Sequence, residues 1–392
     1  MEFASRLNGL APSMTLSINA RAQEMRANGI EVISLAVGEP DFNTPQFIKD
    51  AAKKAIDENF SRYTAVAGIP ELRKAAGAYF ERQYETAVGP ENIIIGAGGK
   101  QCLFTFIQAW INAGDEVLIP SPCWVSYPDM VRLAGGKPVL VKTGKNDGYK
   151  TSALQLEGHT TEKTRLLILN SPANPTGAVY GDREFMNIMR WALARNIYVL
   201  SDEIYDQLVY PPARMTSAIT WFANCPELVG VVNGLSKSYA MTGWRVGFFA
   251  AHAEIIKKMS LIQGHSLSNV TSIAQKAALA ALTEPSDFIS EMREAFMNRR
   301  DLAMQIIDGW PKVSAPRPDG AFYLFLDVSA YYNDKITNSI DLCALLLEKA
   351  HVATVPGAAF GDDACIRLSF AVHENVLQKA MEQIGSVLQS LA

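Results

Sequence analysis

A lysine and an arginine in an otherwise apolar stretch are the first candidates for chemistry in this sequence. Lys237 and Arg245 lie eight residues apart, and Leu, Ala, Met, Gly and Trp are among their neighbours. A lysine in such surroundings can act as a base or a nucleophile, and an arginine offers a planar fork of donors to an anion. The two residues therefore indicate a binding site rather than two surface charges.

Other groups with chemical potential follow short apolar runs. Gly98 and Gly99 form a turn that leads into a helical pattern. The N–H groups of this turn could cradle an anion, or the glycines could serve only the turn. Trp124 could stack on a planar ligand or belong to the core. Asn174 lies in a proline-containing loop, where it could present an amide to a ligand. Asp202 follows an apolar run, where a buried carboxylate needs a cationic partner.

The elements that must position these residues are strands and crossover helices. From about residue 46 to 285, short β-branched runs alternate with helical patterns, which predicts βαβ units and a mostly parallel sheet. Ligands of such sheets bind beyond the carboxyl ends of the strands, so we expect the groups above to converge there. The expected strands are 92–95, 116–119, 166–169, 197–200, 228–232 and 246–250, and the expected helices include 70–84, 100–113 and 182–195.

One ligand would use all of these strand ends. They supply a phosphate-type cradle, an aromatic platform, an amide, the Asp202 carboxylate with the Tyr205 phenol, and the Lys237–Arg245 pair. A phosphorylated aromatic cofactor with an aldehyde and a basic ring nitrogen would occupy every one of them. Pyridoxal 5′-phosphate is that cofactor.

Composition limits the class of protein and its partners. The chain has 392 residues, 48% of them hydrophobic, and its 36 Lys+Arg against 40 Asp+Glu give a net charge of −4. These values predict a soluble protein of two or three domains and offer no basic patch for nucleic acid or an anionic membrane. The five cysteines contain no CxxC pair, so we expect free thiols and no metal site. The first residues, MEFASRLNGLAPSM, lack the apolar core of a signal peptide, and we expect a cytoplasmic location.

We expect two domains. Residues 46–285 form the large α/β domain, and residues 1–45 together with 286–392 form a smaller, discontinuous α+β domain. Thr44 as N-cap and Pro45 in the first turn of a helix mark the entry to the large domain.

The sequence resembles the fold-type-I, class I aminotransferases over essentially its whole length, and it is most similar to the bacterial branch that contains aspartate and prephenate aminotransferases. The matching motifs are AVGEPDF (36–42), GGKQ (98–101), CWVSY (123–127), NPTG (174–177), SDEIY (201–205), SKSYAMTGWR (236–245) and CIRLSF (365–370).

The resemblance implies roles around the cofactor ring. Lys237 would form a Schiff base with pyridoxal phosphate and then act as the base that moves the substrate proton, with Asp202 and Tyr205 as the other catalytic residues. Asp202 would pair with the ring nitrogen. Tyr205 and Asn174 would hydrogen-bond the ring's phenolic oxygen, and Trp124 would stack on the ring. Trp124 and Asn174 would also border the substrate.

The resemblance also implies how the phosphate is held. Arg245 would donate to it together with the turn formed by Gly98, Gly99 and Lys100. Tyr63 matches a tyrosine that reaches the phosphate of the neighbouring subunit, so the active unit would be a homodimer with shared active sites.

The substrate side follows from four further positions. Arg367 would bind the α-carboxylate, and Gly38 would let the amino-terminal segment close over it. Thr15 and Lys100 match positions that contact the distal carboxylate in the bacterial aspartate aminotransferase branch, although Lys100 could instead be a solvated residue at a helix start.

The expected activity is transfer of the amino group from aspartate or glutamate to a 2-oxo acid such as 2-oxoglutarate, with prephenate an acceptor in the same branch. An aromatic or alanine-type aminotransferase and a pyridoxal phosphate-dependent C–S lyase remain alternatives. A cofactor-sensing transcription regulator would need a helix-turn-helix segment, and a nicotinamide dehydrogenase would need GxGxxG after a first strand. Neither feature is found, and HExxH and GxSxG are also missing from the sequence.

Overall fold

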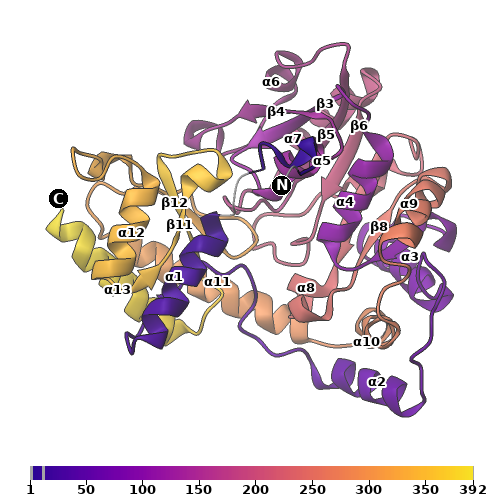
Figure 1. Ribbon diagram of the computed structural model, residues 1–392, viewed down its shortest axis with the longest axis horizontal. Helices are drawn as coiled ribbons and strands as arrows, with labels where there is room; N and C mark the ends of the chain where they lie inside the picture. The colour runs from indigo at the N-terminus through magenta and orange to yellow at the C-terminus, as the bar shows by residue number, and fades with distance from the viewer. Residues whose placement is uncertain (1–2, 11–13, 392) are drawn as a thin grey trace.

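A seven-stranded, mostly parallel sheet forms the centre of the larger part of the molecule (Figure 1). The computed structural model describes residues 3–10 and 14–391, without the side chains of residues 14–17 and 19. The strand order is β2-β8-β7-β6-β5-β3-β4, and β8 alone runs antiparallel to its neighbours. The strands are β2 (Ile93–Gly96), β3 (Glu116–Ser121), β4 (Lys137–Lys142), β5 (Thr164–Asn170), β6 (Tyr198–Asp202), β7 (Val229–Gly234) and β8 (Gly247–Ala250).

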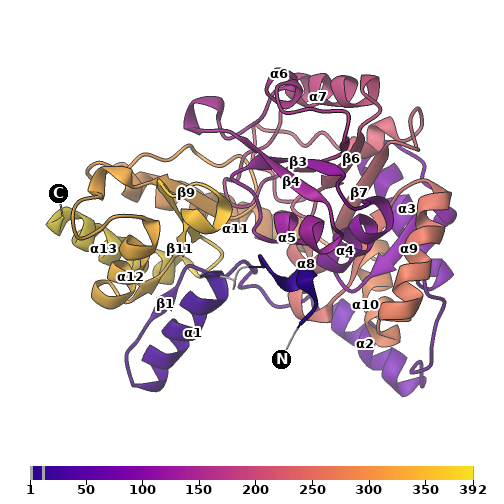
Figure 2. The same ribbon diagram turned by 45° about the horizontal axis from the view of Figure 1, so that its top comes forward.

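Helices cover both faces of this sheet, which explains why its inner strands are continuous apolar runs. Ile93 and Ile95 of β2 pack into the core on one face, and Ile94 packs into the core on the other. Figure 2 shows α4 and α5 on the opposite side of the sheet from α7. One face is covered by α4 (Gly99–Trp110), α5 (Ser126–Leu133) and α9 (Ala253–Ser266), and the other by α2 (Gln46–Asp57), α3 (Pro70–Tyr84), α7 (Asp182–Ala194) and α10 (Ser272–Thr283).

A second, smaller part contains a three-stranded antiparallel sheet. Its order is β11 (Val355–Pro356), β12 (Cys365–Ser369), β9 (Tyr323–Asp327). A two-stranded parallel sheet joins β1 (Ile33–Ser34) to β10 (Val352–Ala353), so the amino-terminal segment lies beside the C-terminal region. The helices here are α1 (Met14–Ala27), α11 (Phe288–Ile307), α12 (Ser339–Lys349) and α13 (Glu374–Ser390). The exact domain boundaries, 46–285 against 1–45 with 286–392, stay a prediction.

The fold class agrees with the expectation from sequence, and the local differences have physical reasons. Edge strand β4 was not among the expected strands, because its side chains are mostly half-buried or exposed and its apolar signal is weak. The prediction that Thr44 caps α2 was wrong. Pro45 occupies the N-cap position, and the Thr44 hydroxyl instead donates to the Ala240 carbonyl at 2.8 Å.

The five cysteines are free thiols, as their spacing predicted. Within residues 3–10 and 14–391, the helices are either too short or too polar to cross a bilayer.

Candidate active site

A cavity of about 610 Å³ opens at the carboxyl ends of β5, β6 and β7, beside the small sheet. The parallel strands bring Asn170, Asp202 and Gly234, their last residues, to the same edge of the sheet. The sequence-predicted residues that line the cavity are Gly38, Gly99, Lys100, Trp124, Asn174, Asp202, Tyr205, Lys237, Arg245 and Arg367.

Lys237 is placed by a short turn that follows β7. The Asn233 side chain accepts a hydrogen bond from the Gly234 N–H at 2.7 Å, and α8 (Leu235–Ser238) begins directly afterwards. The Lys237 ammonium group donates to the Gly38 carbonyl at 2.5 Å. Burial lowers the pKa of Lys237 to about 8, so a neutral amine is accessible near neutral pH.

Asp202 is a buried carboxylate at the end of β6. It accepts hydrogen bonds from the Tyr127 hydroxyl at 2.7 Å and from the Ile204 N–H at 3.2 Å. Burial raises the pKa of Asp202 to about 6, and the bond from Tyr127 opposes that rise. Because no cationic side chain of the described ranges forms an ion pair with it, Asp202 can accept a cationic group from a ligand.

The glycine turn and Arg245 form one unit at the start of α4. Gly98 is the N-cap residue of α4 and has a φ of 84°. Arg245 donates to the carbonyls of Ala97 at 3.1 Å and Thr242 at 3.0 Å. A Cβ atom on Gly98 would lie 2.7 Å from Nη2 of Arg245. Gly98 is thus not part of the cavity wall; its role is to leave room for the arginine.

Lys100 and Trp124 lie together on the wall of the cavity. The Lys100 ammonium group is 4.8 Å from the centre of the Trp124 ring. Burial, followed by the positive charge of Arg245, lowers the pKa of Lys100. The Trp124 ring makes an edge-on contact with Tyr127 at 5.2 Å between centroids. Lys100 is thus an exposed residue that lines the cavity, with its ammonium group over the Trp124 ring.

Arg367 is a buried cation, with 4% of its surface exposed. Its guanidinium donates to Asn174 Oδ1 at 2.9 Å and to the Ala36 carbonyl at 2.8 Å, while Nε has no hydrogen-bond partner. In the described part of the chain it has no acidic partner. A buried arginine without an acid is suited to bind the carboxylate of a ligand.

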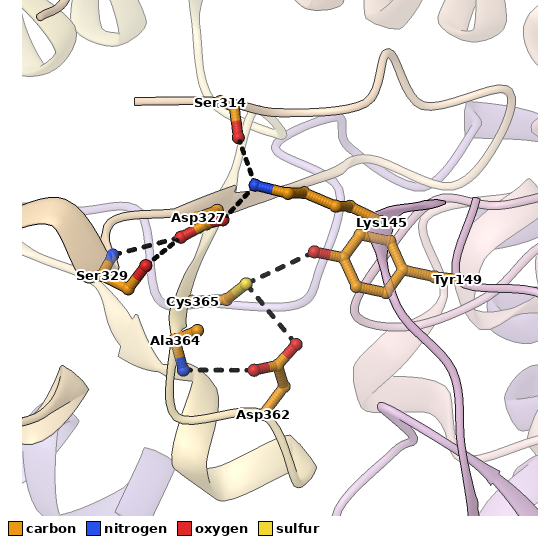
Figure 3. Close-up of polar contacts among 8 residues, drawn as sticks. All are labelled: Lys145, Tyr149, Ser314, Asp327, Ser329, Asp362, Ala364 and Cys365. Atoms are coloured by element: carbon orange, nitrogen blue, oxygen red, sulfur yellow. Dashed lines mark hydrogen bonds and ion pairs between the residues drawn. The ribbon is translucent and has the colours of Figure 1, made fainter. Parts of the chain in front are cut away.

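Contacts between the two sheets fix the strand that carries Arg367 (Figure 3). Lys145, in the loop after β4, forms an ion pair with Asp327 of β9 at 2.6 Å. Tyr149 from the same loop lies 3.4 Å, hydroxyl to sulfur, from Cys365 of β12. Cys365 is two residues before Arg367, so these contacts hold the small sheet against the cavity.

Among the predicted residues that the structure describes in full, Gly98 and Tyr63 do not line the cavity. The side chain of Tyr63 is 91% exposed, as expected if it serves another subunit. Thr15 falls in α1, but its side chain lies outside the described residues.

Three further residues line the cavity that we did not single out from the sequence. Tyr127 binds Asp202, Asn170 Oδ1 accepts from the Asn174 N–H at 2.8 Å, and the Tyr323 hydroxyl lies 2.8 Å from that of Tyr205. Tyr127 was within a quoted motif, whereas Tyr323 lies in none of the quoted motifs. Its role depends on how the small sheet meets the large one, which local sequence does not reveal.

Fold and site together define an enzyme with a lysine, a carboxylate and two arginines in one cavity. Residues 30–384 match the family described as aminotransferase class I and II, and the chain belongs to that family. The protein is therefore an aminotransferase, as the sequence motifs implied.

Curated and solved relatives agree over the full length. The probable aspartate/prephenate aminotransferase of Aquifex aeolicus (strain VF5) is 42% identical over 390 residues, covering 99% of each chain. The crystal structure of the aspartate aminotransferase from Rhizobium meliloti is 38% identical with a TM-score of 0.95 and covers 99% of each chain. The aspartate aminotransferase from Thermus thermophilus with maleate is 39% identical with a TM-score of 0.93, covering 99% of this chain and all of that one.

Proposed function

We propose that this aminotransferase uses pyridoxal 5′-phosphate to move an amino group from aspartate or glutamate to a 2-oxo acid such as 2-oxoglutarate, with prephenate as a further acceptor. One observation carries the proposal. Lys237, whose pKa burial lowers to about 8, faces the same cavity as Arg367, a buried arginine without an acid partner in the described residues. A base and a residue that can bind a carboxylate therefore line the same cavity, where both could act on one amino acid substrate.

The cavity fits the cofactor on the evidence of its unsatisfied groups. Asp202 is a buried carboxylate without an ion-pair partner among the described side chains, and it suits a protonated ring nitrogen. A Cβ atom on Gly98 would collide with Arg245, so this glycine leaves room for the guanidinium group at the start of α4. We assign the phosphate to the Arg245 side chain and to the backbone N–H groups of Gly99 and Lys100. The ring face is assigned to Trp124, the ring nitrogen to Asp202, the ring oxygen to Tyr205 and Asn174, and the aldehyde to Lys237.

The chain's own residues then divide the work of transfer. When bound, pyridoxal phosphate supplies a carbonyl that condenses with amines and a ring that withdraws electrons from the substrate α-carbon. The neutral amine of Lys237 would act as the base that moves the proton between the substrate α-carbon and the cofactor. Arg367 would hold the α-carboxylate, and the Gly38 carbonyl accepts a hydrogen bond from Lys237. The buried carboxylate of Asp202 would stabilise the positive charge of the protonated ring nitrogen.

Lys100 supports a dicarboxylate substrate. Its ammonium group lies in the cavity, over Trp124, and is free of an acid partner within the described ranges. The Thermus thermophilus relative carries maleate, a dicarboxylate, in its structure. We assign Lys100, with Thr15, to the distal carboxylate.

We also propose a homodimer with shared active sites. The exposure of Tyr63 supports this, because a tyrosine that is 91% exposed is available to a second subunit. The cytoplasmic location stays a prediction.

The test of substrate class compares amino donors in a matched pair of variants. In Lys100→Ala, kcat/KM for aspartate should fall about 10- to 100-fold, because a charged hydrogen bond is lost. The value for alanine should change little. Lys142→Ala, an exposed lysine at the end of β4, should leave both values unchanged.

Three results would contradict the proposal. If the purified protein has no visible absorbance that borohydride removes, the cofactor is excluded. If borohydride still links the cofactor covalently to Lys237→Ala, the assigned lysine is excluded. An equal loss on aspartate and alanine in Lys100→Ala would exclude its role in selecting dicarboxylates. Release of pyruvate and a thiol from cystathionine, with no transamination of aspartate, would favour the C–S lyase alternative.

A further inference from the structure

Tyr323 lies where the small sheet meets the cavity. It is the first residue of β9, and 1% of its surface is exposed. Its hydroxyl lies 2.8 Å from the Tyr205 hydroxyl, and the two rings meet edge to face at 5.8 Å between centroids. The two phenols are therefore hydrogen-bonded inside the site.

The Tyr323 ring also contacts Arg367. β9 and β12 are antiparallel, and Tyr323 is opposite Ser369, so Arg367 is a diagonal neighbour. The carbon at the centre of the guanidinium is 4.4 Å from the centroid of Tyr323 and 4.9 Å from that of Phe360. Two aromatic rings thus fix the orientation of the guanidinium group.

The same hydroxyl limits the position of Gly38. A Cβ atom on Gly38 would lie 2.6 Å from the Tyr323 oxygen, which means that the phenol fills the space a side chain would need. The Gly38 carbonyl in turn accepts the hydrogen bond from Lys237. Tyr323 therefore contacts Tyr205 on the cofactor side and Arg367 on the substrate side. It also lies next to Gly38, whose carbonyl is hydrogen-bonded to Lys237.

We propose that Tyr323 is a positioning residue with two separable actions: its hydroxyl orients and polarises Tyr205, and its ring holds Arg367. The inference rests on the proposed function, in which Tyr205 donates to the ring oxygen of the cofactor. The Tyr205 oxygen would then be free to accept a hydrogen bond from the Tyr323 hydroxyl. A phenol that accepts a hydrogen bond becomes a stronger donor, because bonds in a chain polarise one another.

Two substitutions separate these actions. Tyr323→Phe removes the hydroxyl and keeps the ring, whereas Tyr323→Leu removes both. Tyr331→Phe is the matched control, since Tyr331 is also buried in the small sheet region but donates to the Pro311 carbonyl away from the cavity.

The measurements are the pH midpoint of the visible absorption of the cofactor-loaded enzyme and the separate values of kcat and KM. In Tyr323→Phe the midpoint should move up by about 0.4 to 1 pH unit, because weaker donation to the ring oxygen favours protonation. Its kcat should fall several-fold, with KM for aspartate within about twofold of the original. Tyr323→Leu should show the same shift in midpoint and, in addition, a rise in KM of about 10-fold or more.

The failure of this inference is distinct from failure of the proposed function. An unmodified enzyme without a titrating visible band would overturn the proposed function itself. If that band is present and Tyr323→Phe titrates like Tyr331→Phe, the hydroxyl has no effect on Tyr205 and that half of the proposal is wrong. If Tyr323→Leu binds aspartate as tightly as Tyr323→Phe, the ring does not hold Arg367.

Discussion

At the scale of single residues, the site works by moving two ionisation equilibria toward neutral pH. Burial lowers the pKa of Lys237 to about 8 and raises that of Asp202 to about 6. Groups whose environments alter their pKa values in opposite directions are typical of acid–base sites. The hydrogen bond from the Tyr127 hydroxyl is the main interaction that opposes the rise in the pKa of Asp202, because it stabilises the ionised carboxylate.

The first prediction concerns this bond. Tyr127→Phe should raise the pKa of Asp202 in the cofactor-free protein by about one to two units, since a hydrogen bond to a charged group is lost. The protonated acid cannot pair with a cationic ring. Cofactor affinity should therefore weaken as the pH falls through about 6 in the original protein, and at a higher pH in the variant. The measurement is the cofactor dissociation constant between pH 5 and 8.

A matched control separates this effect from loss of a buried phenol. Tyr180 is buried and accepts from the Thr151 N–H, outside the cavity. Tyr180→Phe should leave the pH dependence of cofactor binding unchanged. Identical pH profiles for both variants would show that Tyr127 does not tune Asp202.

At the scale of elements, the glycine turn before α4 depends on both backbone conformation and space. Gly98 has a φ of 84°, and Gly114, in the turn before β3, has a φ of 88°. A Cβ atom on Gly98 would meet Arg245 at 2.7 Å, whereas one on Gly114 would have no atom within 4 Å. The two glycines therefore share a positive φ but differ in what lies beside them.

The second prediction uses this pair. Gly98→Ala and Gly114→Ala should each destabilise the protein by about 1 to 2 kcal/mol, because alanine disfavours the left-handed region. Only Gly98→Ala should also weaken cofactor and inorganic phosphate binding, by about 10-fold or more, since Arg245 must move. Urea unfolding and cofactor titration measure the two effects. Equal cofactor affinities in the two variants would contradict the assigned phosphate site.

The helices and strands also show which features of the fold and the site could be predicted from the sequence. The helix at 70–84 and the six expected strands agree with the structure to within one or two residues, because their apolar patterns are strong and they are bounded by turns. Asp202 and Asn174 could be found because strand ends converge at one edge of a parallel sheet. Thr44 was misassigned since its hydroxyl has a partner 196 residues away at Ala240. Tyr323 was missed for the same reason, because its contacts with Tyr205 and Arg367 join residues that are distant in the sequence.

At the scale of the whole molecule, the cavity is shared between two sheets that polar contacts hold together. Asp41 of the amino-terminal segment forms an ion pair with Arg299 of α11 at 2.7 Å, and Lys145 forms one with Asp327. The two halves of the site, Lys237 in the large part and Arg367 in the small one, depend on these contacts for their separation. The proposed domain division places the cofactor residues in one unit and the α-carboxylate receptor in the other.

The last prediction tests whether the molecule also depends on a second copy of itself. If Tyr63 serves the phosphate of the neighbouring subunit, Tyr63→Ala should weaken cofactor binding, and Lys237→Ala should abolish transfer. A hybrid dimer of the two variants should contain one site with both residues intact. Unfolding and refolding an equal mixture should then restore about a quarter of the original sites, because half of the randomly paired dimers are hybrids with one complete site each.

The measurement is transaminase activity of the refolded mixture against each variant refolded alone. A mixture of Lys237→Ala with Asp202→Ala is the control, because both residues belong to the same cavity. If Lys237 and Asp202 of a cavity come from the same chain, each of the two cavities in such a hybrid carries one of the changes and neither is intact. This mixture should therefore show no gain in activity over the two variants refolded alone. If activity recovers in the mixture of Tyr63→Ala with Lys237→Ala but not in the control mixture, the result supports a shared site. Activity that equals the average of the two separately refolded variants would show that Tyr63 acts within its own chain or has no role at the phosphate.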